Sequence, residues 1–332
     1  MERKSHTIFL KKKPKIIGSY SIVGPKEGQG NFAPYFDYIM KKDNFGESTF
    51  EKAERKMLES AISGVIGKAK LSPKDIDIMI AGDLLNQIIS SSYSARAFEF
   101  PFIGVYGACS TMAESMAVGA VLVDGGFCKN VLCCTGSHFS TAERQYRFPL
   151  ELGNQRPPTS QWTVTGAGAC ILSLDGQAPH VSSVTFGKVV DWGVNDVNNM
   201  GSAMAPATKD TMISHFRNTN TSPLDYDLVV TGDLGKLGSE ILIDLMEEEG
   251  FVLGQNYCDC GQMFFKREQD TLCGGSGAGC CATVFNSYIM KNFLAGKLKK
   301  ILFLPTGALL STTSCQQGDT IPGVCHAIVI EA

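Results

Sequence analysis

The sequence predicts an α/β fold in which strands and helices alternate in two similar halves. Of the 332 residues, 44% are hydrophobic and 19% are charged, which suits a large core. Short apolar runs alternate with segments of helical periodicity, the arrangement of layered α/β proteins. Two stretches of the first half recur in the same order in the second half. The fold is therefore expected to be duplicated.

The repeated stretches are short apolar strands followed by small polar residues. Residues 76–84 read IDIMIAGDL and residues 226–234 read YDLVVTGDL, so each strand stops at Gly-Asp. A second pair follows: VLCCTG at 131–136 precedes a Ser-Thr, and LFLPTG at 302–307 does the same. Two ordered matches indicate an internal duplication.

The two halves are expected to cover residues 15–176 and 177–332. Each half ends in a stretch that predicts a closing strand, at residues 163–174 and at residues 324–330.

Three helices are predicted between the repeated strands. Residues 50–68 carry apolar side chains at helical spacing, and Ser48 is expected to cap this helix. Residues 110–123 are small and apolar on nearly every side, which predicts a buried helix that stops at residues 124–126, Asp-Gly-Gly. Its counterpart in the second half is expected at residues 283–294.

Charge and hydropathy argue against a nucleic-acid partner and against a membrane-spanning segment. The 30 Lys and Arg against 33 Asp and Glu give a net charge of -3, so no broad basic surface for nucleic acid is expected. No apolar stretch is long enough to span a bilayer, and the N-terminus does not resemble a secretory signal. We expect synthesis in the cytoplasm and membrane contact only through partner proteins.

The 12 cysteines are expected to be reduced thiols. No two have CxxC spacing and no histidine completes a zinc site, so no metal ligands are predicted. Several lie in apolar runs such as residues 131–134, where Cys packs as a small hydrophobic residue. The glycine-rich run at 274–279 lacks the spacing of a dinucleotide site, and tight packing at a helix start is expected instead. No cofactor is predicted.

Cys109 is the strongest chemical candidate. An apolar strand, residues 102–106, ends in small residues, and the buried helix begins directly after Cys109. We call residues 107–111 the Cys109 elbow. Backbone amides and the helix dipole meet at such a junction, which favours a thiolate and also favours a bound anion. The sequence leaves three roles open for Cys109: a nucleophile, a part of an anion site, or an inert buried thiol.

A catalytic role would need a base and oxyanion donors around the thiol. None of the five histidines lies in a pattern typical of a catalytic base. His138 follows the strand that ends at Gly136 and could reach the central pocket, although a hydrogen-bonded role at the strand end is the alternative. His326 is the other candidate base.

The Cys109 elbow, the duplication and the terminal strands resemble the thiolase and ketoacyl-synthase superfamily. More specifically, the chain resembles the stage V sporulation protein AD family of endospore-forming bacteria over nearly its whole length. The stretches that carry this resemblance are AGDLLNQ (81–87), GACST (107–111), VDGGF (123–127), TAERQ (141–145), MGSAMAP (200–206) and TGALLS (306–311). The resemblance implies a thiolase-like fold with duplicated halves in α-β-α-β-α layers.

The sequence departs from the condensing enzymes of the superfamily at two places. Where those enzymes have a His after the repeated strand of the second half, this chain has Gly232-Asp233. Where they have Asn or His in the later glycine-rich turn, it has Gly-Gly-Ser at 274–276. The resemblance thus implies a pocket that has lost catalysis, since Cys109 lacks its usual partners. The rival is an active acyl-transferring or Claisen-condensing enzyme with Cys109 as nucleophile.

The family resemblance implies binding of dipicolinic acid (pyridine-2,6-dicarboxylic acid) and its movement, with calcium, into the developing spore. The pocket residues it carries over are Cys109, Asp259 and Cys260. Asp259 would repel a dianion unless Ca²⁺ bridges the two or the carboxyl is protonated. A solvated turn residue is the alternative for Asp259.

The amides of Ser110 and Thr111, at the start of the buried helix, are expected to hold the dianion. With His138, they complete the predicted ligand-binding residues.

The resemblance also implies partners and a location. It implies contact with other stage V sporulation membrane proteins, a homodimer formed through strands near the Cys109 elbow, and a peripheral position at the forespore or spore inner membrane. A purely structural subunit that holds membrane partners together is a third interpretation.

Overall fold

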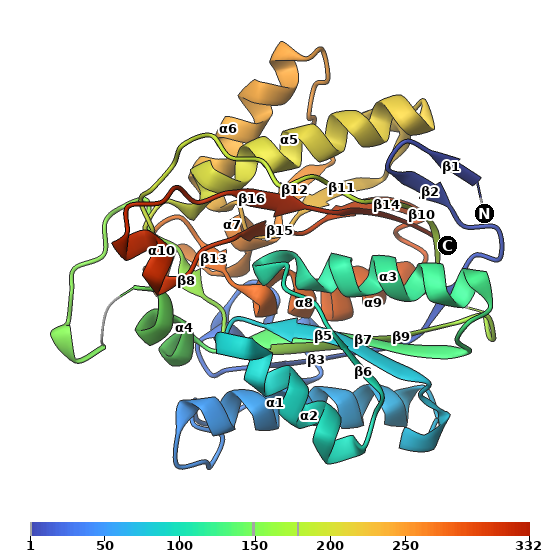
Figure 1. Cartoon of the computed structure of the whole chain (residues 1–332), viewed down its shortest axis with the longest axis horizontal. Helices are drawn as coiled ribbons and strands as arrows, with labels where there is room; N and C mark the ends of the chain where they lie inside the picture. The colour runs from blue at the N-terminus through green and yellow to red at the C-terminus, as the bar shows by residue number, and fades with distance from the viewer. Residues whose placement is uncertain (1, 148–149, 178) are drawn as a thin grey trace.

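The computed structural model describes residues 2–147, 150–177 and 179–332, and its elements form α-β-α-β-α layers (Figure 1). The outer helices of the first half are α1 (Phe50–Lys68) and α2 (Ile89–Phe98), and those of the second half are α5 (Met200–Thr219) and α6 (Gly235–Glu248). Between the sheets lie α3 (Thr111–Gly125), α8 (Ala278–Val284) and α9 (Met290–Leu294). This is the layered architecture that the sequence predicts.

Strand pairing runs continuously through both halves, in the order β12-β11-β14-β17-β10-β3-β9-β7-β5-β6. The strands of the first half are β3 (Lys15–Val23), β5 (Ile78–Asp83), β6 (Phe102–Gly104), β7 (Asn130–Ser137) and β9 (Gly166–Ser173). Those of the second are β10 (His180–Thr185), β11 (Leu228–Thr231), β12 (Tyr257–Asp259), β14 (Lys300–Leu304) and β17 (Ala327–Glu331).

The duplication is visible in the strand order. Outward from the centre, the halves read β3-β9-β7-β5-β6 and β10-β17-β14-β11-β12, and in each the first two pairings are antiparallel and the next two parallel. The two sets of strands meet where His180 of β10 pairs with Lys15 of β3. The parallel strands β5 and β11 are the repeated Gly-Asp strands, so they occupy equivalent places.

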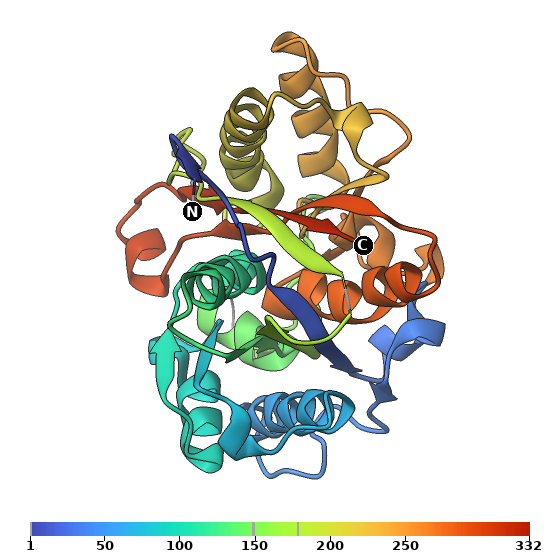
Figure 2. The same ribbon diagram turned by 90° about the vertical axis from the view of Figure 1, so that its right-hand side faces the viewer.

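Smaller elements complete the fold. They are β1 (Glu2–Lys4), β2 (Thr7–Phe9), β4 (Tyr38–Ile39), β8 (Trp162–Thr163), β13 (Gly275–Ser276), β15 (Thr306–Ala308), β16 (Gly323–Cys325), α4 (Phe139–Tyr146), α7 (Cys260–Phe264) and α10 (Thr312–Gln316). β2 pairs with β10, so the first residues of the chain run beside the second half (Figure 2).

Helix α1 begins and ends at the predicted residues. Its apolar stripe, which includes Met57, Ile62 and Val65, is fully buried against β3 and β9. The predicted cap was wrong: the hydroxyl of Thr49, not Ser48, accepts the amide of Lys52 at 3.3 Å. Thr49 has extended backbone directly before the first helical residue, which is the geometry that a capping side chain requires.

The buried helices differ from the prediction at their starts. α3 begins at Thr111, after a 3₁₀ turn at Ala108–Ser110, and Gly126 ends it with φ 78°. Its counterpart begins at Ala278 rather than at residue 283, directly after Gly277 with φ 95°, and reaches Leu294 through a π-helical turn at Phe285–Ile289. The glycine-rich run is thus a tight helix start.

Candidate functional site

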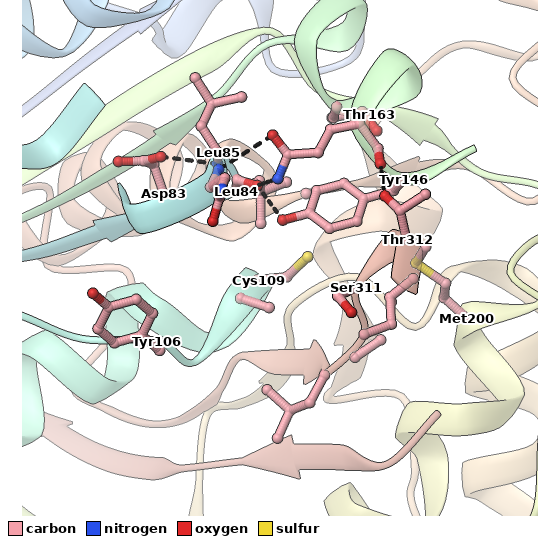
Figure 3. Close-up of a pocket in the computed structure, with 18 of the residues that line it drawn as sticks. Asp83, Leu84, Leu85, Tyr106, Cys109, Tyr146, Thr163, Met200, Ser311 and Thr312 are labelled. Atoms are coloured by element: carbon pink, nitrogen blue, oxygen red, sulfur yellow. Dashed lines mark hydrogen bonds between the residues drawn. The ribbon is translucent and has the colours of Figure 1, made fainter. Parts of the chain in front are cut away.

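A cavity of about 750 Å³ lies beside Cys109, at the end of the sheets where β5 stops (Figure 3). Both halves of the chain line it. The lining residues that matter below are Asp83, Leu85, Tyr106, Cys109, Tyr146, Arg147, Met200, Ser276, Gly277, Thr312 and Thr313. In Figure 3 the sulfur of Cys109 points into the space between Tyr146 and Ser311.

A strained turn presents Cys109 to this cavity. Ala108, the residue before it, has φ 50°, a left-handed conformation that costs a non-glycine residue free energy. The turn closes through the carbonyl of Gly107, which accepts the amide of Ser110 at 3.0 Å. The predicted elbow is therefore present, and it leaves the Cys109 side chain nearly buried at the cavity wall.

Asp233 lies next to the Cys109 thiol. It follows β11, is buried, and accepts hydrogen bonds from Thr306 Oγ1 at 2.7 Å, Ser276 Oγ at 3.0 Å and the amide of Gly277 at 3.0 Å. The Cys109 thiol lies close enough to the same carboxylate for the two groups to shift each other's pKa. Burial outweighs these neutral donors and raises the pKa of Asp233 to about 6.

The neighbouring carboxylate and burial set the state of the thiol. Burial first, and then the charge of Asp233, raise the pKa of Cys109 well above its usual value, while the amide of Gly277 acts weakly in the opposite direction. The expectation of a thiolate was therefore wrong. The helix start cannot offset these effects, because the amides of Ser110 and Thr111 already donate to Gly107 and Ala108. Cys109 is a neutral thiol at pH 7.

The amides and hydroxyls of Ser110 and Thr111, predicted to hold an anion, are used inside the elbow. Ser110 Oγ donates to the Gly107 carbonyl at 2.8 Å and Thr111 Oγ1 donates to the Ala108 carbonyl at 2.7 Å. Both side chains are buried, and neither is among the described residues that line the cavity.

Asp259 is a structural carboxylate at the end of β12. It is fully buried and accepts from Thr231 Oγ1 at 2.7 Å and from the amides of Leu234, Gly235 and Gln262 at 2.9–3.0 Å. It thereby caps α7 and ties that helix to the start of α6. The alternative of a solvated turn residue was wrong, since the side chain has no exposure. Cys260, the next residue, is fully buried in α7, and neither residue lines the described cavity.

The two candidate bases lie elsewhere. His138 caps α4: its Nδ1 accepts the Ser140 amide at 3.1 Å and its Nε2 contacts the carbonyl of Asp43 at 3.0 Å. His326 accepts the amide of Gly187 at 3.2 Å, and burial lowers its pKa to about 4. In the part of the chain that the structure describes, no histidine lines the cavity.

Asp233 is the site residue that sequence reasoning passed over. Its signal was present in the repeated Gly-Asp, whose first copy, Asp83, lines the cavity beside Cys109 and accepts from Ser91 and the amide of Leu85. What the sequence did not reveal is that the end of β11 meets the Cys109 elbow. Tyr146 and Arg147 of the cavity wall were likewise missed.

Two further features bear on binding. Within residues 2–147, 150–177 and 179–332, no cluster of three or more His, Cys, Asp or Glu is arranged to hold a metal ion. Over the same ranges, none of the helices has the length and apolar character needed to cross a bilayer. All 12 cysteines are free thiols.

Solved structures of thiolase-fold enzymes are similar to this chain. The 3-oxoacyl-[acyl-carrier-protein] synthase III of Aquifex aeolicus is 12% identical, with a TM-score of 0.58 over 96% of this chain and 100% of that one. The cerulenin-bound OleA of Xanthomonas campestris is 13% identical, with a TM-score of 0.65 over 98% of this chain and 100% of that one. These likenesses confirm the thiolase-like fold.

The sequence comparisons are more specific. The family model described as stage V sporulation protein AD matches residues 4–331. The stage V sporulation protein AD of Bacillus subtilis (strain 168) is 44% identical over 326 residues, which cover 98% of this chain and 95% of that protein. The chain belongs to the stage V sporulation protein AD family.

Proposed function

We propose that this protein binds dipicolinic acid non-covalently in the cavity beside Cys109 and takes part in its uptake into the developing spore. The observation that carries the non-catalytic part is the position of the buried Asp233 carboxylate beside the Cys109 thiol, where its charge raises the pKa of the thiol. A nucleophilic cysteine needs a partner that accepts its proton and stabilises the thiolate. A buried carboxylate does the reverse, because its charge disfavours a second negative charge beside it.

The surroundings of Cys109 also disfavour stabilisation of an oxyanion. The Gly277 amide donates to Asp233 and the Ser110 amide donates to Gly107. An oxyanion site requires free donors aimed at the reacting atom. These two donors are occupied by groups of the protein itself, which supports a pocket that binds and does not transform its ligand.

The cavity suits a small flat aromatic acid. Leu85, Tyr146 and Met200 offer apolar surface to a ring, whereas Thr312 and Arg147 offer hydrogen-bond donors. Dipicolinic acid is the ligand that membership of the family leads us to expect. Calcium would enter with the ligand, whose own carboxylates and ring nitrogen supply ligands for it.

We extend the proposal to assembly. A homodimer through the outer strand β6 is supported by its position at the end of the strand order and by the exposure of two neighbouring side chains, Ile103 at 40% and Tyr106 at 62%. Tyr106 also lines the cavity, so a partner copy there would lie close to the ligand. Peripheral attachment at the forespore membrane would then come from other stage V sporulation proteins.

Calorimetric titration with dipicolinic acid, with and without Ca²⁺, tests the binding claim. The native chain is compared with Thr313→Trp, which adds bulk at an exposed part of the cavity rim, and with Ser48→Trp, a matched change at an exposed residue that does not line the cavity. Saturable heat in the native chain and Ser48→Trp, with loss in Thr313→Trp, is expected. No heat at millimolar ligand, or equal binding in all three, would contradict the proposal.

Mass spectrometry separates this proposal from an acyl-transfer enzyme. The chain is incubated with acetyl-CoA and with longer acyl-CoA thioesters, and the mass of the peptide that contains Cys109 is measured. We expect the unmodified thiol. An acyl adduct on Cys109 that disappears on addition of an acceptor would establish the rival instead.

A further inference from the structure

Arg147, directly after α4, and Arg156, in the segment before β8, share one carboxylate. Arg147 Nη1 and Arg156 Nη2 both pair with the same oxygen of Glu143, Oε1, and the Arg156 contact is 2.9 Å. Arg156 also donates to the carbonyl of Gln161 at 2.6 Å. Among the described residues, no second carboxylate forms an ion pair with either guanidinium. The Arg147–Glu143–Arg156 cluster therefore carries one positive charge in excess.

Arg147 brings this charge to the cavity wall. It lines the cavity beside Cys109 and also a smaller neighbouring cavity of about 360 Å³, which Glu143 and Arg156 line as well. Of the described residues that line the larger cavity, Arg147 is the single cation. An anion that enters the cavity therefore meets one fixed positive charge.

One edge of the Arg147 guanidinium has no partner in the described part of the chain. The side chain is only 6% exposed, and its Nε is buried without a hydrogen-bond partner in the described part of the chain. A buried donor of a charged group is costly when it is unpaired. Because Nη1 binds Glu143, Nε and Nη2 form the remaining edge, and such an edge matches the two oxygens of a carboxylate.

We propose that Arg147 binds a carboxylate of the ligand through this edge and gives the cavity its preference for acids. The inference rests on the proposed function and names the residue that recognises the acid. Near Cys109 lie two buried carboxyl groups, those of Asp83 and Asp233. A dicarboxylate would therefore place one end against Arg147, and the excess charge would not favour a neutral ring of the same shape.

The test uses two ligands of the same shape, pyridine-2,6-dicarboxylate and the neutral pyridine-2,6-dicarboxamide. Their affinities are measured by calorimetry for the native chain, Arg147→Gln and Arg144→Gln. Arg144 is the matched control because it lies three residues before Arg147, in α4, carries the same charge, pairs with Glu51 on the surface and does not line the cavity. Thermal unfolding of each variant checks that it is folded.

Arg147→Gln should weaken binding of the dicarboxylate by about 10- to 100-fold, the range for a lost hydrogen bond to a charged group. The dicarboxamide should change by less than about twofold, and Arg144→Gln should behave as the native chain. If Arg147→Gln does not fold, Arg147→Lys replaces it. That variant keeps the charge but loses the two-donor edge, and a loss of about tenfold is expected.

The outcomes distinguish this inference from the proposed function. If the native chain binds the dicarboxylate and Arg147→Gln or Arg147→Lys binds it equally well, the role of Arg147 is overturned while the proposed function stands. The same holds if both ligands lose affinity equally, since that would mean a loss of shape and not of acid recognition. If the native chain binds neither ligand, the proposed function and this inference both fail.

Discussion

The thiol of Cys109 lies beside the buried carboxylate of Asp233, whose charge helps to raise the pKa of the thiol. The two residues come from different halves of the duplicated chain: Cys109 precedes α3 and Asp233 follows β11. The charge of Asp233 disfavours the thiolate of Cys109, because two adjacent negative charges in a buried site repel one another, whereas the pKa of Asp233 is itself raised by burial. The thiol of Cys109 is thereby less reactive, while the backbone turn of the Cys109 elbow is kept.

The first prediction concerns the reactivity of this thiol. Alkylation of Cys109 by iodoacetamide should be slow at pH 8, and its rate should still be rising above pH 9, because only the thiolate reacts. Asp233→Asn removes the neighbouring charge and should increase the rate at pH 8. Cys315, which is partly exposed, serves as the internal reference in the same peptide map. A midpoint for Cys109 below pH 8 would show that the thiol is activated.

The second prediction concerns stability and pH. Burial raises the pKa of Asp233 from 3.8 to about 6 in the folded chain. The stabilisation from the protonated form is complete below about pH 4 and is lost as the pH rises through 6, a change of about 3 kcal/mol. Asp233→Asn should remove this change. The free energy of unfolding of the variant should therefore rise relative to that of the native chain between pH 4 and 7. The difference between the two chains isolates Asp233 from other buried acids such as Glu27, whose pKa is also raised, to about 7.

Urea unfolding of both chains at pH 4, 5, 6 and 7 measures this difference. A free-energy difference that stays constant over the range would mean that Asp233 is ionised throughout.

The third prediction concerns the close packing behind the elbow. A Cβ on Gly82 of β5 would lie 2.2 Å from the backbone oxygen of Val105, in the segment that leads to Cys109. Gly82→Ala should cost about 1–3 kcal/mol of stability, because backbone must move to admit the methyl group. Gly67→Ala, on the exposed face of α1 with nothing within 4 Å, should instead stabilise the chain by up to about 1 kcal/mol.

Denaturant unfolding of the two glycine variants provides the comparison. Equal effects would show that the contact between β5 and the segment before Cys109 is looser than described.

The fourth prediction separates two adjacent residues at the start of α1. Thr49→Ala should cost about 1 kcal/mol, because Thr49 Oγ1 caps the helix at the amide of Lys52. Ser48→Ala removes a hydroxyl that only contacts the exposed side chain of Lys52, and it should change stability by less than about 0.5 kcal/mol. A larger loss of stability for Ser48→Ala than for Thr49→Ala would show that Ser48 caps the helix, as the sequence suggested.

The elements that the sequence predicts well are those whose residues repeat a simple pattern. The stripe of α1 fixes residues 50–68, and the repeated Gly-Asp strands identify β5 and β11 as equivalent. The wrong predictions concern helix ends, which depend on backbone geometry and not on the hydrophobic pattern. Gly277 starts α8 ahead of the predicted residue 283, and the extended backbone of Thr49 makes it the cap.

The site was harder to predict because its contacts join distant segments. The family resemblance implies that Asp259 and Cys260 line the ligand pocket. In the structure, the carboxylate of Asp259 instead accepts four hydrogen bonds from groups around α6 and α7. Asp233 stands where condensing enzymes have a His, but only the approach of the end of β11 to the Cys109 elbow places it beside Cys109. Arg147 follows a helix whose amphipathic pattern gives no sign of the cavity it lines.

The crystal structure of the chain soaked with dipicolinic acid tests the central claim most directly. We predict density for the intact pyridine ring inside the cavity between Leu85 and Tyr146, a carboxylate against Arg147, and an unmodified sulfur on Cys109. Ligand density confined to other surfaces while the cavity stays free of it, or a covalent adduct on Cys109, would contradict the account.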